Sequence, residues 1–279
     1  MSGTLDLIRS CLEALRASEK KVAKCVLADP EAVIRSSITE LAEKAGTSEP
    51  TVIRFCRKLG LGGYLELRLN LARDLPSAQY IFENVGEKDS LAEIVSKILN
   101  AHREAISNTL NKLNLDDLEA AVQALLAARR IEFYGVGGSA IVARDAHHKF
   151  FRLGLPCIAY DDPHMQVMSA ALLSPEDVVI AVSHTGSTKD IIDSVQVARK
   201  AGAKVISILG SENAPLVKLS TITLSVFSQE AALRLAPMTS RMVQLAIVDV
   251  LFVAVAMRGF DSIKERLDRV KRSLVEKRY

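Results

Sequence analysis

Apolar residues recur at helical spacing over the first 76 residues of this 279-residue chain, and the same spacing returns over 91–113 and 116–128. The pattern then changes to short runs rich in β-branched and aromatic residues, at 131–136, 157–160, 177–183, 204–209 and 222–227. Segments of helical length and character separate the first four runs. Because strands that alternate with helices form parallel sheets covered on both faces, the pattern predicts a five-stranded parallel sheet flanked by helices.

The periodicity is lost between residues 75 and 90, where Pro76 and Gly86 disfavour regular structure, and we interpret this stretch as a linker. A long apolar helix is predicted over 239–258, where Asp249 interrupts the apolar run. The predicted order is an all-α domain, a linker with a connecting helix, an α/β domain and a charged C-terminal helix, over residues 1–77, 78–115, 116–260 and 261–279.

Residues 36–60 predict two short helices joined by a tight turn. Ser37 and Glu40 have the spacing of a reciprocal helix N-cap, and Ser48 can cap the second helix. Gly46, between the two helices, suits the left-handed conformation that commonly ends a helix. Apolar stripes at helical spacing run along both helices, through Ile38, Leu41, Ala42 and Ala45 and through Val52, Phe55, Cys56 and Leu59. Two helices joined in this way form the helix-turn-helix unit.

The outward face of the second helix carries polar and basic residues. In DNA-binding proteins of this type, the N-terminal part of the second helix contacts base edges. Arg54 is the candidate for a bidentate contact to guanine, whereas Arg57 and Lys58 suit phosphates. The candidate DNA-binding residues are Ser48, Glu49, Thr51, Arg54, Arg57 and Lys58. On spacing alone, an ordinary helical pair with a solvated basic face explains the pattern equally well.

Two loops rich in glycine and hydroxyl side chains follow two of the predicted strands. The first contains Gly137, Gly138 and Ser139, and the second contains Ser183, His184, Thr185, Gly186, Ser187 and Thr188. Each lies where a parallel strand turns into a helix, whose first amides and positive dipole end attract anions. Ligands of open α/β sheets bind at the carboxyl ends of the strands. Two such loops in one sheet therefore predict a shared pocket for a small phosphorylated molecule.

Two other interpretations of these loops remain open. The Ser and Thr residues are also suited to capping helices. Gly135, Gly137 and Ala140 match the Gly-x-Gly-x-x-Ala pattern of a dinucleotide site, with Asp161 as the acid that would hold the ribose. A Walker A loop does not fit, because the terminal Gly-Lys-Ser/Thr is missing.

Composition narrows the class of protein. The net charge of +3 is too small to announce a nucleic-acid partner, so a DNA argument depends on the local motif. The N-terminus lacks the order of a signal peptide, and no apolar run reaches the 18 residues that span a bilayer. The 4 cysteines form no CxxC pair and predict structural free thiols. We expect a cytoplasmic protein with no membrane contact, cofactor or metal.

The stretch 37–72, with residues 18–33 before it, resembles the winged-helix-like DNA-binding domain of the RpiR family of bacterial transcription regulators. The stretches 130–154 and 178–208 resemble the sugar isomerase (SIS) domain. The resemblance covers nearly the whole chain and is strongest to the HexR branch of the family. It implies that Ser139, Ser183, Thr185 and Thr188 hold a phosphate, with Thr185 in place of the Ser usual at that position. It further implies control of hexose and Entner–Doudoroff genes and a response to 2-keto-3-deoxy-6-phosphogluconate.

Two functions are compatible with these features. The first is a DNA-binding regulator, expected to be a repressor, that senses a phosphorylated sugar acid and reads a pseudo-palindromic operator as a homodimer or higher homo-oligomer. The second is a phosphosugar aldose–ketose isomerase, which needs a base near the substrate carbon. His164 and Glu230 are the candidates for that base, and with Arg234 they are the predicted pocket rim. Nothing fixes the two together, so we predict a regulator with no catalytic residues.

Overall fold

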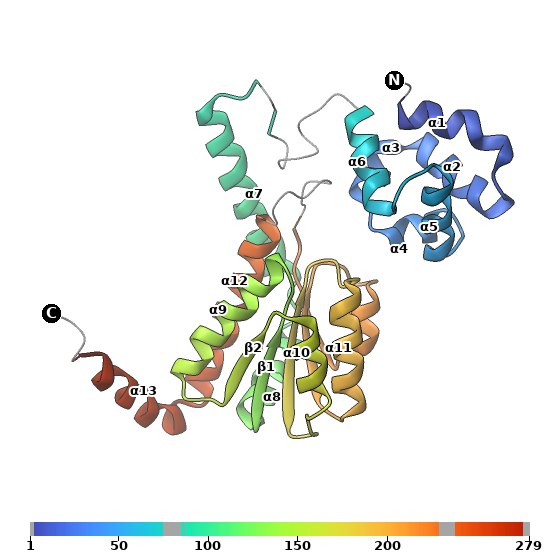
Figure 1. The fold of residues 1–279 in the computed structure, drawn as a ribbon. Coiled ribbons are helices and arrows are strands. Elements are labelled where there is room, and N and C mark those ends of the chain that lie inside the picture. Colours follow the sequence, from blue (N-terminus) through green and yellow to red (C-terminus); the bar gives the residue numbers. More distant parts are fainter. Residues whose placement is uncertain (1–2, 75–84, 87, 229–237, 276–279) are drawn as a thin grey trace. The chain divides into compact units, whose positions relative to one another are not determined.

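The computed structural model describes residues 3–74, 85–86, 88–228 and 238–275, which fall into two compact units (Figure 1). The first unit extends to Ala101 and the second begins at His102, so the boundary lies inside one long helix, α7 (Leu91–Lys112). The first unit is helical, and the second unit contains the whole sheet.

The helices of the first unit pack around one apolar core. They are α1 (Thr4–Cys11), η1 (Leu12–Ala14), α2 (Ala17–Ala28), α3 (Pro30–Arg35), α4 (Ile38–Lys44), α5 (Glu49–Lys58) and α6 (Tyr64–Asp74). Ile8, Val26, Phe55 and Leu67 come from four of these helices and are fully buried in that core. The buried hydroxyl of Tyr64 donates to the carbonyl of Val33 at 3.0 Å, which fastens α6 to α3.

Helices α4 and α5 form the predicted helix-turn-helix. The Glu40 amide donates to Ser37 Oγ at 3.2 Å and the Ser37 amide donates to Glu40 Oε2 at 2.7 Å, so the reciprocal cap is confirmed. Gly46 adopts the predicted left-handed conformation, with φ of 59°. The predicted cap at Ser48 is wrong, because its hydroxyl makes no bond to the first-turn amides of α5 and instead lies 3.1 Å from Thr51 Oγ1.

The second unit has a five-stranded parallel sheet, as predicted. The strands are β1 (Arg130–Tyr134), β2 (Cys157–Tyr160), β3 (Asp177–Ser183), β4 (Lys204–Leu209) and β5 (Ile222–Ser225), in the order β2-β1-β3-β4-β5. Three strands match the predicted bounds, while β1 and β5 each end two residues earlier than expected. The chain builds outwards in one direction from β1 to β2 and in the other from β3 to β5, so the order reverses between β1 and β3.

Helices cover both faces of the sheet (Figure 1). The second unit contains α8 (Leu115–Ala127), α9 (Gly138–Arg152), α10 (Pro163–Ala170), α11 (Lys189–Lys200), η3 (Pro215–Leu219), α12 (Thr239–Arg258) and α13 (Phe260–Val275). α8, α9 and α12 share one apolar cluster with the sheet, and α10 and α11 share the cluster on the opposite face. This arrangement matters for the site because α9 and α11, which follow the two loops, lie on different faces.

Within the described residues, α12 is the one helix long and apolar enough to cross a membrane, with a mean hydropathy of 1.8. Its residues Val243, Ile247, Leu251 and Val255 are buried in the cluster that includes the sheet. Asp249, on its exposed side, pairs with Lys149 of α9 at 2.5 Å. The helix is therefore packed as a core helix of the α/β unit.

Candidate functional site

The two predicted loops leave the sheet side by side. Tyr134 of β1 pairs with Ala181 of β3 in the parallel ladder, so loops 135–139 and 183–188 both lie at the carboxyl ends of the strands. The strand order reverses between β1 and β3, the two strands that precede these loops. Open α/β sheets bind ligands at such a switch point, outside the carboxyl ends of the strands. The topology thus brings the two loops together, as their separate strand-to-helix patterns predicted.

The first loop turns tightly through glycine. Gly137 has φ of 56°, and Gly138 begins α9 with no side chain capping the first turn. A Cβ on Gly135 would lie 2.6 Å from the carbonyl oxygen of Ser139, so only glycine fits at that position. Ser139 lies in the first turn of α9 and is half-buried. The Ser139 and Ala140 amides donate to the Val136 and Gly137 carbonyls, each at 3.2 Å, so the first turn presents the Ser139 hydroxyl at the positive end of α9.

Hydroxyl groups shape the backbone of the second loop. The Gly186 amide donates to Ser183 Oγ at 3.2 Å, and Ser183 is only 3% exposed. The Ser187 amide donates to Thr185 Oγ1 at 3.3 Å, and Ser187 Oγ donates back to the Thr185 carbonyl at 3.2 Å. Thr188 precedes α11 without capping it, so its side chain leaves the first amides of α11 available.

Gly186 and His184 pack against residues that follow β4. Gly186 has φ of 59°, and a Cβ on it would lie 2.5 Å from the Cβ of Ala214. A Cβ on Gly210 would lie 2.5 Å from Cε1 of His184, so the imidazole rests directly on the Gly210 backbone. The Gly210 amide also donates to the His184 carbonyl at 2.8 Å. The loop is thus packed closely onto the end of β4.

The predicted rim is described only in part. His164 is exposed in the first turn of α10, after Asp162, whose carboxylate accepts the amide of Met165 at 2.9 Å. Glu230 and Arg234 lie outside the described residues. Asp161, the acid of the dinucleotide interpretation, pairs with Arg144 of α9 at 3.0 Å.

Gln166 of α10 is a residue that the sequence patterns did not single out. It is fully buried, and its Nε2 donates to the carbonyls of Gly135 at 3.2 Å and Tyr160 at 2.9 Å. Ser194 of α11 donates to its Oε1 at 3.3 Å. The signal that could have revealed it is a polar residue four positions before Ala170, on the apolar side of a short helix.

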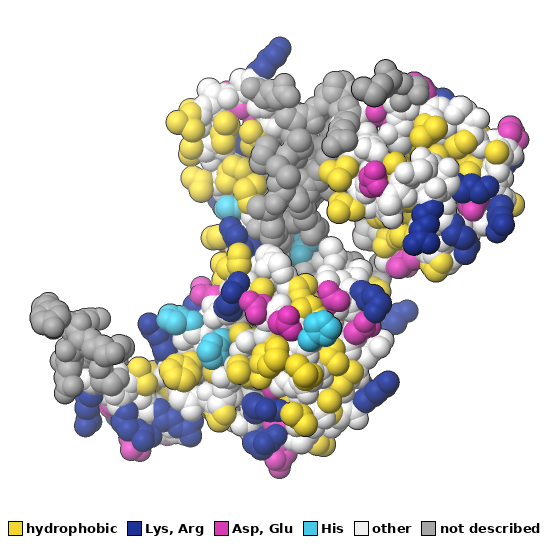
Figure 2. Space-filling model, viewed as in Figure 1, with side chains coloured by type: hydrophobic (Ala, Val, Ile, Leu, Met, Phe, Trp, Pro, Cys, Tyr) yellow, Lys and Arg dark blue, Asp and Glu magenta, His cyan; other side chains and the backbone are white. Residues whose placement is uncertain are grey.

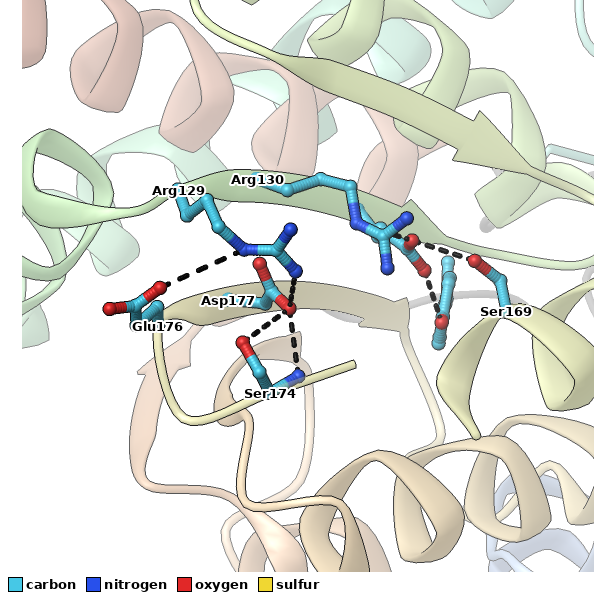
Figure 3. Close-up of polar contacts among 8 residues, drawn as sticks. Arg129, Arg130, Ser169, Ser174, Glu176 and Asp177 are labelled. Atoms are coloured by element: carbon cyan, nitrogen blue, oxygen red, sulfur yellow. Dashed lines mark hydrogen bonds and ion pairs between the residues drawn. The ribbon is translucent and has the colours of Figure 1, made fainter. Parts of the chain in front are cut away.

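Two carboxylates are fully buried in the sheet (Figure 3). Glu132 accepts the hydroxyl of Tyr134 at 2.5 Å and that of Ser169 at 2.7 Å, which ties α10 to β1. Its negative charge and the burial of the ring raise the pKa of Tyr134, with burial the larger cause. Both groups lie beneath the loops, and they stiffen the strand from which the first loop arises.

Asp177 is the second buried carboxylate and lies at the amino end of the central strand β3, away from the two loops (Figure 3). It accepts from Arg129 at 2.7 Å and from the Ser174 amide and hydroxyl at 2.8 and 2.9 Å. Burial alone would raise its pKa, but these hydrogen bonds outweigh burial and hold the pKa below the ordinary value. The pair is structural, since it is remote from the carboxyl ends of the strands.

The predicted DNA-binding residues of α5 differ in their exposure to solvent. Arg54, Arg57 and Lys58 are exposed, as predicted for DNA-contacting residues. The prediction that Thr51 lies on the outward face is wrong, because Thr51 is 4% exposed, and its hydroxyl accepts from Arg54 Nη2 at 2.8 Å. Thr51 therefore orients Arg54 within its own helix.

The other residues of this helix face fit the prediction in part. Ser48 is exposed, and Glu49 is half-buried, accepting the hydroxyl of Thr39 at 2.6 Å. Ile53 of the same helix packs against the core of the unit. Lys58 Nζ donates to the Ala14 carbonyl at 3.4 Å. In Figure 2, Lys and Arg side chains gather on the helical unit over the part where Figure 1 labels α5.

Comparison with known proteins assigns both units. Residues 2–78 match the model of the helix-turn-helix domain of the rpiR family, and residues 124–254 match that of the SIS domain. The chain is 38% identical over 276 residues to the HTH-type transcriptional regulator HexR of Escherichia coli K12, covering 99% of this chain and 95% of HexR. It is 42% identical over 258 residues to the bifunctional protein glk of Paraburkholderia xenovorans. This match covers 92% of this chain but only 40% of the glk protein.

A solved structure is also similar over nearly the whole chain. The Vibrio vulnificus NanR protein complexed with ManNAc-6P has a TM-score of 0.83 and 29% sequence identity, and the match covers 98% of each chain. The dinucleotide interpretation of the first loop is not supported, because the matching family is the SIS domain. SIS domains occur in isomerases as well, but this chain matches a named HTH-type regulator over almost its full length.

Proposed function

Since this chain belongs to the RpiR family of helix-turn-helix transcriptional regulators with a SIS domain, we propose that it is a repressor released from its operator by a phosphorylated sugar acid. The proposed effector site is formed by loops 135–139 and 183–188. The proposed operator contacts are made by α5. As a regulator of genes, it would act in the cytoplasm.

The observation that carries the effector site is the meeting of two helix N-termini at the switch point of the sheet. α9 and α11 both begin at this edge, and neither has a side-chain cap on its first turn. A phosphate bound there would accept from bare amides and from hydroxyls such as that of Ser139, with both helix dipoles favouring its charge. The close packing of Gly186 on Ala214 holds one side of this site in position.

The kind of effector follows from relatives. The similar NanR structure is described as a complex with ManNAc-6P, which is a phosphorylated sugar derivative. From the resemblance to the HexR branch, we propose 2-keto-3-deoxy-6-phosphogluconate as the effector and hexose and Entner–Doudoroff catabolic genes as the targets. The loops account for the phosphate of the effector, and we propose that Arg234, one of the three predicted rim residues with His164 and Glu230, balances its carboxylate.

On the DNA side, we propose that Arg54 reads a base and that Arg57 and Lys58 bind phosphates. Two copies of the chain would present two α5 helices to the halves of a pseudo-palindromic operator. Release requires that the effector bind more tightly to an arrangement of the two copies that does not fit the operator. The coupling is therefore reciprocal, and operator DNA should weaken effector binding by the same factor.

An operator-release assay tests this proposal. A labelled duplex, selected by the protein from a random pool, is titrated with protein and then with 2-keto-3-deoxy-6-phosphogluconate, with fluorescence anisotropy as the readout. The wild type should release the duplex, and Ser139→Ala should bind it normally but need several-fold more effector. Ser174→Ala, next to the amino end of β3 and away from the two loops, is the matched control and should respond as the wild type. A Ser139→Ala response at wild-type effector concentrations would place the phosphate elsewhere.

A further inference from the structure

Gln166 joins three separate pieces of the α/β unit through one side chain. Its amide group contacts the first loop at Gly135, the end of β2 at Tyr160 and the middle of α11 at Ser194. The side chain is 0% exposed, so all of these bonds form out of reach of solvent. The orientation of the amide is consistent throughout, because the nitrogen faces two carbonyls and the oxygen faces a hydroxyl.

These contacts reach both halves of the proposed effector site. Gly135 begins the loop that leads to Ser139, and its carbonyl direction fixes the plane of the peptide that joins it to Val136. Ser194 lies on α11, which starts directly after Thr188, and its single hydroxyl proton is shared between the Asp190 carbonyl at 2.8 Å and Gln166 Oε1 at 3.3 Å. Through Gln166, the backbone of the first loop is therefore tied to the helix that carries the second loop.

We propose that Gln166 is a positioning residue that sets the spacing between the two phosphate-binding loops without touching the effector. This inference rests on the proposed function, since it assigns a role within the same site. Without the amide, the Gly135 carbonyl loses a buried donor, and α10 no longer links the first loop to α11. The two loops would then be less well ordered around the phosphate. Effector affinity would fall, while the fold persists.

The test compares two buried polar residues of the same helix. Gln166→Met keeps the length of the side chain and removes all of its hydrogen bonds. Ser169→Ala removes the bond to Glu132 Oε1, which ties the same helix to β1 but reaches neither loop. Affinity for 2-keto-3-deoxy-6-phosphogluconate is measured by calorimetry on the folded full-length protein, and the melting temperature is measured without ligand.

We expect both variants to melt earlier than the wild type, and only Gln166→Met to bind the effector more weakly, by about three- to tenfold, which corresponds to one hydrogen bond. Equal affinities for Gln166→Met and wild type would reduce Gln166 to a packing residue and overturn the inference. If the wild type itself does not bind the sugar acid, the proposed function fails and the inference falls with it, a pattern easily distinguished from the first.

A second variant covers the case in which Gln166→Met does not fold. In Gln166→Glu the introduced carboxyl faces two carbonyl oxygens, and burial there raises its pKa. The protonated form can donate to one carbonyl and the ionised form cannot. Relative to wild type at the same pH, the loss of affinity should therefore be larger at pH 8 than at pH 6. A loss that is absent, or equal at both pH values, contradicts the positioning role.

Discussion

Replacing Gly186 with alanine tests how rigidly the second loop is held. Gly137 and Gly186 both have a positive φ, of 56° and 59°. They differ in their surroundings, because a Cβ on Gly137 meets nothing within 4 Å, whereas a Cβ on Gly186 would lie 2.5 Å from the Ala214 Cβ. Gly137→Ala is therefore a matched control that has the backbone strain without the collision.

The expected magnitudes follow from these two contributions. A backbone with positive φ costs on the order of 1–3 kcal/mol for a residue with a Cβ, and this applies to both variants. Overpacking a close contact adds about 1–3 kcal/mol for Gly186→Ala alone. We therefore expect Gly137→Ala to lose about 1–3 kcal/mol and Gly186→Ala about 2–6 kcal/mol of unfolding free energy. For a domain of this size, each kcal/mol corresponds to roughly 2–4 °C in melting temperature.

The assay is differential scanning calorimetry of the full chain, following the transition of the α/β unit. The double variant Gly186→Ala, Ala214→Gly removes the opposing methyl group and should recover part of the loss. Effector binding should weaken in Gly186→Ala even below its melting temperature, because the loop must shift to admit the new methyl. Equal stability of the Gly137→Ala and Gly186→Ala variants would refute the reasoning, since it would mean that the loop moves off β4 without penalty.

Two further predictions concern the operator and pH. Arg54→Ala should weaken operator binding at fixed salt by about 1–3 kcal/mol and relax preference at one base pair, measured by anisotropy on single-base variants of the duplex; an unchanged affinity would remove Arg54 from the base-reading set. Because the folded pKa of Asp177 is lowered, its stabilisation is complete above the unfolded value of about 3.9 and is lost as pH falls through the folded pKa. Asp177→Asn should therefore lower the melting temperature at pH 7, with the difference shrinking in acid, and a difference that is constant down to pH 2 would contradict this assignment.

The features that the sequence predicted well are those with local causes. The reciprocal cap at Ser37, the left-handed Gly46 and the alternation of strands and helices each depend on a few neighbouring residues. The position of the two loops at one edge also followed, because parallel strands end together. The strand order could not be read in this way, since it depends on which strands pair across the sheet.

The burial of Thr51 and the role of Gln166 did not follow from the sequence motifs. Thr51 lies four residues before Phe55, so helical periodicity places it towards the core, where its hydroxyl is satisfied by its own helix. Gln166 gave no motif because its partners, Gly135 and Ser194, are about thirty residues away on either side. A polar side chain of this kind becomes meaningful only when the elements around it are in place.

The reliance of the two loops on backbone amides has a consequence for how such a regulator can diversify. In the proposed site, main-chain groups and small hydroxyls would bind the phosphate and make no contact with the rest of the molecule that carries it. Discrimination among metabolites is left to side chains further out, which can be exchanged without disturbing the turns at Gly137 and Gly186. A change of inducer in a laboratory selection should therefore arise from substitutions around the mouth of the site, while the glycines and serines of the two turns stay as they are.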